Sequence, residues 1–168
     1  MALADAVREW DGKSAEDISG IFQDHARKPG FVDQVVDSIG NPETERGMTW
    51  LLKAWLESGE RLNSKQLSRV YRCLNQLQHW EGKLHILQCI PHMPVPAANK
   101  ENTEWFLREA LSDNNKFIRA WAYNGFHQLA QQFPEYQTEV NQFIELAMRD
   151  EAASVKARIR NMLKLSEK

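Results

Sequence analysis

The chain has 168 residues, of which 42% are apolar and 26% charged, a balance typical of one folded domain and not of a disordered chain. Its 21 basic and 23 acidic side chains give a net charge of −2, which does not favour a general binder of nucleic acid or of anionic membranes. No stretch approaches the roughly 18 apolar residues of a membrane span, and the N-terminus lacks an apolar signal core, so we expect a soluble, cytoplasmic domain without membrane partners.

Apolar residues recur at helical spacing along nearly the whole chain, and no segment alternates as a half-buried strand would. The first clear stripe contains Met48, Leu51, Leu52, Trp55 and Leu56. Later stripes cover 67–77, 118–129, 140–147 and 155–163. The pattern therefore predicts an all-α fold of eight or nine helices.

Helix ends are marked by capping residues. Asn63 with Gln66 predicts a helix start, because the pair resembles a capping box. Asn41 before Pro42 predicts another helix that starts at the proline. Gly59 follows that helix, where a left-handed C-terminal residue is commonly glycine.

The stripes repeat with a period near 37 residues. Met48, Ile86, Ala122 and Ile159 are separated by 38, 36 and 37 residues. Each lies in a helix preceded by another amphipathic helix, at about 31–39, 65–79, 101–112 and 136–149. Four such pairs predict a right-handed α-solenoid that forms a single domain over 1–168. Residues 1–26 would form an N-terminal capping helix, and the repeats would cover about 31–58, 64–91, 98–133 and 135–165.

The last two second helices resemble those of HEAT repeats, in which an Asp in the turn is followed six residues later by a basic residue. The matching positions are Asp113, Arg119, Asp150 and Lys156. The resemblance implies an armadillo/HEAT-like fold in which these four residues form a ladder of hydrogen bonds between adjacent repeats. The first two pairs depart from the pattern, because Glu45 and Lys83 stand at the basic position without the Asp partner. The resemblance specifies a fold and not a chemistry.

The same resemblance implies that the second helices line a concave surface, where we expect a partner to bind. The candidate partner-binding residues are Trp50, Lys53, Tyr123, His127, Arg160 and Lys164. Exposed aromatic and arginine side chains are typical of interface hot spots. For Trp50 a second interpretation stays open, in which it covers the N-terminal helix around 14–26, and Tyr123 is then an ordinary surface residue.

Candidate chemical sites are few. His85, Cys89 and His92 form an H-x3-C-x2-H group, but Pro91 breaks the helix before the third residue and no second cluster supplies a fourth ligand. We therefore predict no metal site and a structural, reduced thiol at Cys89. No phosphate-binding loop, nucleophile elbow or zinc-protease motif occurs, which favours a chain without catalytic residues or cofactor.

Two functional hypotheses remain, with a spacer domain of a larger complex as a third. The favoured one is a non-catalytic protein–protein interaction or scaffold module that binds a protein or peptide along the concave groove. The alternative is a HEAT-like DNA-binding or DNA alkylation-repair protein. HEAT-like alkylation-repair glycosylases hold a damaged, cationic base with an aromatic side chain and a carboxylate, and here Trp105 and Glu109 share a helical face. For Trp105 we favour packing between helices. A local charge of +4 over 156–168 is compatible with either an acidic peptide or a phosphate.

Overall fold

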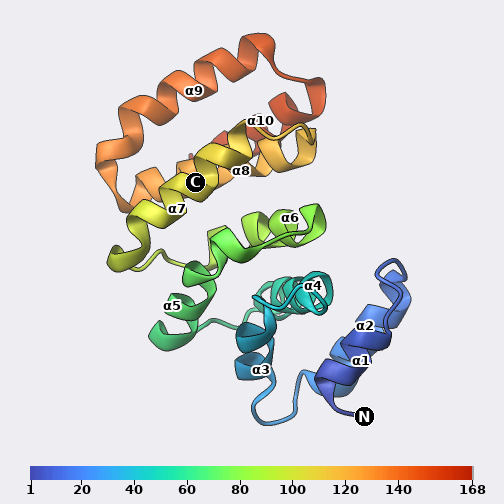
Figure 1. Ribbon diagram of the computed structural model, residues 1–168. Helices are drawn as coiled ribbons and strands as arrows, with labels where there is room; N and C mark the ends of the chain where they lie inside the picture. The colour runs from blue at the N-terminus through green and yellow to red at the C-terminus, as the bar shows by residue number, and fades with distance from the viewer. Residues whose placement is uncertain (168) are drawn as a thin grey trace.

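The computed structural model describes residues 1–167, which form ten α-helices and four short 3-10 helices without a strand (Figure 1). The α-helices are α1 (Leu3–Glu9), α2 (Ala15–His25), α3 (Phe31–Ser38), α4 (Glu45–Glu57), α5 (Ser64–Arg72), α6 (Trp80–Cys89), α7 (Lys100–Leu111), α8 (Lys116–Gln132), α9 (Gln137–Asp150) and α10 (Ala153–Ser166). The 3-10 helices are η1 (Leu74–Gln76), η2 (Ile90–His92), η3 (Ala97–Asn99) and η4 (Pro134–Tyr136). None of the helices in this part of the chain is long and apolar enough to cross a membrane.

The all-α prediction is confirmed, but there are ten helices where eight or nine were expected. One difference lies at the N-terminus, where the segment 1–26 was predicted to hold one capping helix. It holds two, α1 and α2, because the chain turns at Gly12 with a φ of 77°, which favours glycine. A second difference is that α5 ends at Arg72 and not near 79, with η1 continuing the chain as a tighter turn.

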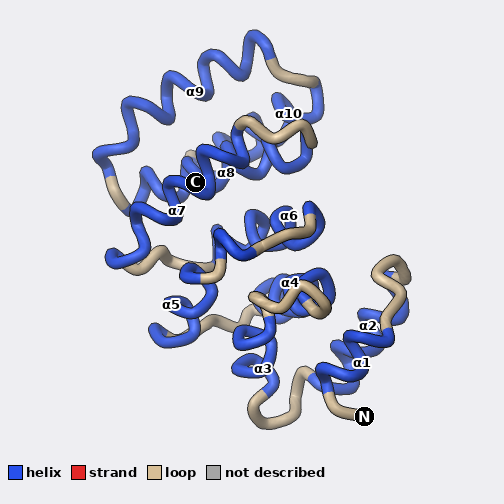
Figure 2. The backbone as a smooth tube through the Cα atoms, in the orientation of Figure 1, coloured by secondary structure: helices blue, strands red, loops and turns tan. Residues whose placement is uncertain are grey.

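The helices follow one another through space from α1 and α2 at one end to α9 and α10 at the other, joined by short loops (Figure 2). The helices that we call the second helices, α4, α6, α8 and α10, pack each against the next in that order. Among the preceding helices, α5 packs against both α3 and α7, and α9 packs against α8. Each helix pair therefore packs mainly against the pair that precedes it and the pair that follows it along the chain.

Most of the apolar core is one continuous cluster that runs from Leu3 to Val140. A second, smaller cluster lies under the last two helices and contains Ala120, Ala147, Val155, Ile159 and Met162. The four positions that carry the 37-residue period, Met48, Ile86, Ala122 and Ile159, are all fully buried. Their burial agrees with the prediction that they belong to the inner face of successive helices.

Two of the three predicted helix ends are confirmed. Asn63 and Gln66 form a reciprocal capping box at the start of α5, and Gly59 adopts a left-handed φ of 102° after α4. The predicted start at Pro42 is wrong. The Asn41 carboxamide oxygen accepts a hydrogen bond from the backbone N–H two residues on, which forms a local turn, and α4 begins only at Glu45.

Side-chain hydrogen bonds join each part of the chain to the part about one period away. Within the described residues, every long-range side-chain hydrogen bond except Tyr71 to Met93 spans between 31 and 39 residues. Asn102 Nδ2, for example, donates to the Tyr71 carbonyl at 2.6 Å, and Arg108 pairs with Glu139 at 2.6 Å. These bonds fix each helix pair to the next one along the chain.

Candidate functional site

A cleft of about 440 Å³ crosses all four second helices. Lys53 and Glu57 line it from α4, and Gln88 lines it from α6, followed by Pro91 and His92 in η2. The lining residues on α8 and α10 are Trp121, Asn124, His127, Gln128, Gln131, Arg158, Met162, Leu165 and Ser166. Because α4, α6, α8 and α10 each contribute lining residues, the cleft runs across the stacked second helices.

A stacked pair of side chains, Trp121 and Arg158, forms one side of the cleft. The Arg158 guanidinium carbon lies 4.4 Å from the centroid of the Trp121 ring. The two residues stand 37 positions apart, so they occupy equivalent places on α8 and α10. A guanidinium that stacks on an aromatic face keeps its N–H donors in its own plane, where a carboxylate can accept from two of them.

Side-chain amides form much of the remaining surface. Gln88, Asn124, Gln128 and Gln131 all line the cleft. A carboxamide donates two hydrogen bonds and accepts two, which matches the N–H and C=O groups of a peptide backbone. This composition suits an extended peptide better than an apolar small molecule.

His127 lies in the wall of the cleft and joins α8 to α10. Its Nε2 is 2.6 Å from Ser166 Oγ and 3.1 Å from Gln131 Nε2. Burial lowers the pKa of His127, so the ring is neutral at pH 7. Ser166 Oγ also lies 3.1 Å from the Met162 carbonyl, and within residues 1–167 the buried His127 Nδ1 has no hydrogen-bond partner. A nucleophilic triad needs a third group that orients the imidazole through Nδ1, and the Ser166–His127 pair has no such group within the described residues.

The cleft carries a small excess of positive charge. Lys53 pairs with Glu57 at 3.3 Å, while Arg158 contributes a second cation that stacks on Trp121. Burial is the main cause that lowers the pKa of His92, as it is for His127, so neither ring adds charge at pH 7. An anionic group is therefore favoured here over a cationic one.

The structure brings together only part of the predicted groove. The six predicted residues were Trp50, Lys53, Tyr123, His127, Arg160 and Lys164. Lys53 and His127 line the cleft. Trp50 and Tyr123 are half-buried and pack against the two apolar clusters, and Arg160 and Lys164 are exposed outside the cleft. The 37-residue register leads from Lys53 through Pro91 to His127, but on α10 it is Leu165 and Ser166 that line the cleft and not Lys164.

Sequence reasoning missed Trp121 as a site residue. It flanks the buried stripe of α8 and packs against the large apolar cluster, but it also lines the cleft. The available signal was its spacing from Arg158, since an aromatic and an arginine at equivalent positions of adjacent second helices can stack.

The predicted ladder residues take different partners. Arg119 donates to the Asp113 and Asn114 carbonyls, both at 3.0 Å, and to Glu151 Oε1 at 3.0 Å. The acidic partner in the following turn is thus Glu151, the neighbour of Asp150. The Asp113 carboxylate accepts from the Asn115 N–H at 2.8 Å. No hydrogen bond or ion pair of the Asp150 or Lys156 side chain occurs within residues 1–167.

Glu45, an acidic residue, makes a comparable link earlier in the chain, between the start of α4 and the turn before α6. Its side chain is fully buried and accepts hydrogen bonds from the Gln78 N–H at 2.7 Å and the His79 N–H at 2.8 Å. These two amides precede α6, where helix N–H groups lack partners within the helix. A Cβ at Gly82 would overlap the Glu45 carboxylate, so glycine allows the close approach.

The H-x3-C-x2-H group is split between different environments. His85 Nδ1 lies 2.9 Å from Thr49 Oγ1, and Cys89 is fully buried. Burial raises the pKa of the Cys89 thiol, which disfavours the thiolate that a metal would need. In the part of the chain that the structure describes, no group of three or more His, Cys, Asp or Glu side chains is placed to hold a metal ion.

His85 makes the stability of the protein depend on pH. Burial lowers its pKa to about 4, so between about pH 6.5 and pH 4 the unfolded chain binds a proton here that the folded chain does not. Stability therefore falls as the pH is lowered through this window, by an amount on the order of 2 kcal/mol at pH 4.5. Urea unfolding at several pH values should show that His85→Asn loses less stability than the wild type. Parallel losses in the two proteins would contradict this assignment.

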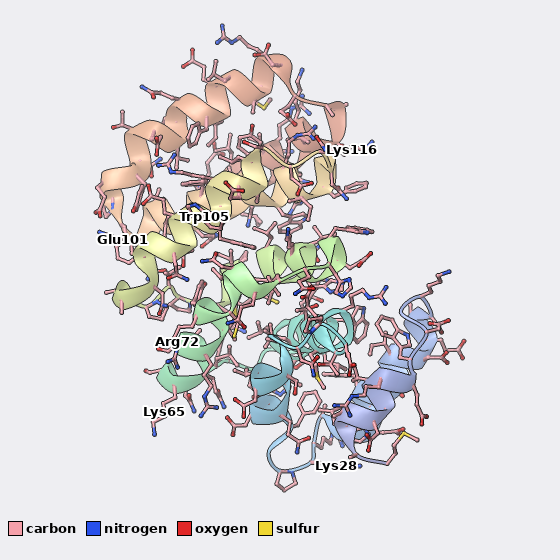
Figure 3. The ribbon with its side chains drawn as sticks, in the orientation of Figure 1. Lys28, Lys65, Arg72, Glu101, Trp105 and Lys116 are labelled. Carbon is pink, nitrogen blue, oxygen red and sulfur yellow. The ribbon has the colours of Figure 1, made fainter. Side chains whose placement is uncertain are left out.

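The expectation that Trp105 packs between helices is wrong. Its side chain is 54% exposed on α7 (Figure 3). It borders a hollow of about 180 Å³ together with Lys83, Glu109 and Asp113. The carboxylates of Glu109 and Asp113 outnumber the single cation of Lys83, so the charge of this hollow disfavours binding of a phosphate group.

No protein-family model, no curated protein and no solved structure matches the chain, so its function is inferred from its own residues.

Proposed function

We propose that this chain is a right-handed α-solenoid of four HEAT-like helix pairs that acts in the cytoplasm as a non-catalytic interaction module. The proposal is supported by the burial of Met48, Ile86, Ala122 and Ile159 at the predicted period. It is also supported by the long-range side-chain hydrogen bonds, almost all of which span 31 to 39 residues and so join one helix pair to the next. In a solenoid each repeat contacts its neighbours and the stacked second helices form an extended binding surface.

The observation that carries the functional part is the cleft across α4, α6, α8 and α10. Its carboxamides are suited to the backbone of an extended segment, and the Arg158 guanidinium on Trp121 is suited to a carboxylate. The partner is therefore a peptide segment with at least one acidic side chain, which lies along the second helices. Lys53 supplies a second cation at the opposite end of the cleft.

A peptide-display selection tests this proposal, with random 12-residue peptides as the probe and the whole chain as bait. We expect enrichment of Asp or Glu at one position. Arg158→Ala should lower the affinity for the enriched peptides about 30-fold, which is the effect expected when an interface hot-spot residue is removed. Arg158→Lys keeps the charge but removes the planar fork, so it should restore only part of the affinity.

Trp105→Ala is the matched control, because it removes an exposed tryptophan outside the cleft. It should leave peptide affinity unchanged. Equal losses in Trp105→Ala and Arg158→Ala, or enriched peptides without acidic residues, would reject the cleft as the binding site.

The DNA-binding or alkylation-repair alternative is favoured by one observation, the exposure of Trp105 beside Glu109. It predicts duplex binding that weakens steeply with salt, because phosphate contacts release counterions. Fluorescence anisotropy with a labelled duplex at low salt distinguishes the two functions. Duplex binding that Trp105→Ala abolishes would replace the peptide proposal.

A further inference from the structure

The first two helices are acidic, and the last helix, at the other end of the stack, is basic. Residues 1–26 contain six acidic and two basic side chains, which gives a net charge of −4. At the other end, α10 carries Lys156, Arg158, Arg160 and Lys164 and no acidic residue, whereas α9 carries Glu139, Glu145 and Asp150 against Arg149. The α1–α2 hairpin and the α9–α10 pair lie at opposite ends of the molecule (Figure 1). The first two helices and α10 therefore carry opposite charge, although the net charge of the chain is only −2.

The acidic end is hollowed. A depression of about 760 Å³ lies over α1 and α2, with Trp10 and Ile21 among its apolar lining residues. Its acidic lining residues are Glu9, Asp11, Glu16, Asp17 and Asp24, and none of its lining residues in the described chain is basic. Glu16 and Gly20 each stand two positions from the buried Ile18, about 200° around the helix, so this surface faces away from the core. We call it the acidic hollow.

The other end presents basic and apolar side chains on a helix face that nothing in the described chain covers. α10 packs against α8 and α9. At about 100° per residue, Arg160 and Lys164 lie 100° and 140° from the buried Ile159. Both are exposed, and no ion pair of either occurs within residues 1–167. Leu163, 37% exposed, lies about 40° from Ile159 on the same side of the helix as these two cations. We call this surface the basic end face.

We propose that the acidic hollow of one molecule binds the basic end face of a second copy, so that the chain associates head to tail. The two surfaces are complementary in charge, because the acidic side chains that line the hollow match the exposed Arg160 and Lys164 of α10, beside which Leu163 is also exposed. Two different surfaces meet, so the contact is heterologous and continues into a row of molecules unless the rotation closes a ring. The proposal does not depend on what occupies the cleft.

Sedimentation velocity of the wild-type chain over a range of protein concentrations is the first measurement. We expect species larger than a monomer at about 0.1 M salt, and their loss near 1 M, where the Debye length falls from about 10 Å to about 3 Å. A wild-type chain that stays monomeric at low salt overturns the proposal. If such a monomer binds a hexa-arginine peptide at the acidic hollow, the occupant is a different basic protein.

Charge reversal at each end tests the pairing of the two surfaces. Arg160→Glu with Lys164→Glu reverses the basic end face, and Glu9→Lys with Asp24→Lys reverses the acidic hollow. Each double variant should raise the dissociation constant of self-association at least about 10-fold. Glu9 and Asp24 lie in the last turns of α1 and α2, where a lysine is favourable to the helix dipole, so folding is retained.

Mixing the two double variants gives the decisive result. The acidic hollow that one variant keeps can bind the basic end face that the other keeps, and the two reversed surfaces also carry opposite charge. The mixture should therefore recover the assemblies that neither variant forms alone. A mixture that stays monomeric overturns the head-to-tail contact.

Lys65→Glu with Arg72→Glu is the matched control for the reversed basic end face, since it makes the same change of charge on α5, away from both ends (Figure 3). It should leave the dissociation constant unchanged. An equal weakening by this control would show that net charge alone governs the association, which also overturns the proposal.

Discussion

Replacing Glu45 by alanine is expected to lower the free energy of unfolding by about 3 kcal/mol. The change removes the acceptor of two backbone N–H groups, those of Gln78 and His79, in a place where the side chain is fully buried. Hydrogen bonds to a charged group each contribute roughly 1.5–3 kcal/mol, and buried donors left without a partner add a further cost. Urea unfolding followed by circular dichroism measures the loss.

Gly82 provides the control for this prediction. A Cβ at this position would overlap the Glu45 carboxylate, so Gly82→Ala in the wild-type background should be destabilising although alanine is the better helix former. In the Glu45→Ala background the overlap is gone, and Gly82→Ala should then be neutral or stabilising. A double-mutant cycle therefore gives a coupling free energy of about 1 kcal/mol or more between the two positions. Additive effects would show that the carboxylate does not contact Gly82.

Phe126→Ala is expected to cost about 4 kcal/mol, the range found when a buried aromatic ring is removed from a core. Phe126 is 1% exposed, and its ring meets Phe143 of α9 edge to face with centroids 5.6 Å apart. The Arg108 guanidinium carbon lies 5.5 Å from the centroid of the same ring. Removal of this ring loosens α7, α8 and α9 together, and scanning calorimetry should show a melting temperature lower by about 10 °C.

Phe117→Ala makes the same chemical change at the start of α8, where the ring is 51% exposed. It should cost less than about 1 kcal/mol. Similar losses in Phe117→Ala and Phe126→Ala would contradict the burial that the structure assigns to Phe126.

The helices were predictable because local signals agree with burial. The apolar stripe of α4 and the capping box of Asn63 and Gln66 both mark helices that the structure contains. The turn at Asn41 was not predictable from Asn-Pro alone, since the same asparagine that can cap a helix also stabilises a turn with its own carboxamide. The α1–α2 hairpin was missed because α1 is only seven residues long, too short for its periodicity to stand out.

The cleft was less predictable than the helices. The repeat register identified Lys53 and His127, which follow the common offset, but it failed on α10, where Leu165 and Ser166 take the place expected for Lys164. A register error of one or two residues turns a helical side chain by about 100–200°, enough to move it from one surface to another. Trp121 and Trp50 both pack against the large apolar cluster, but only Trp121 also lines the cleft.

Glu45 shows a further limit of pattern reasoning. At its position the HEAT-like pattern has a basic residue, so the glutamate stood out only as a departure. The structure gives it the role of a link to the following turn, through backbone amides whose availability no sequence pattern records. A link of this kind depends on the path of the backbone and on the space at Gly82.

The small apolar cluster beneath α9 and α10 ties ligand affinity to local unfolding. In the described part of the chain α10 packs against α8 and α9 only, and it contributes Val155, Ile159 and Met162 to the smaller cluster, so it is expected to open at a lower free energy than the interior helices. Arg158, Met162 and Ser166 leave the cleft when α10 detaches, and the open state then lacks one wall. A peptide in the cleft binds the closed state alone, so it should slow amide hydrogen exchange in α10 in proportion to its occupancy.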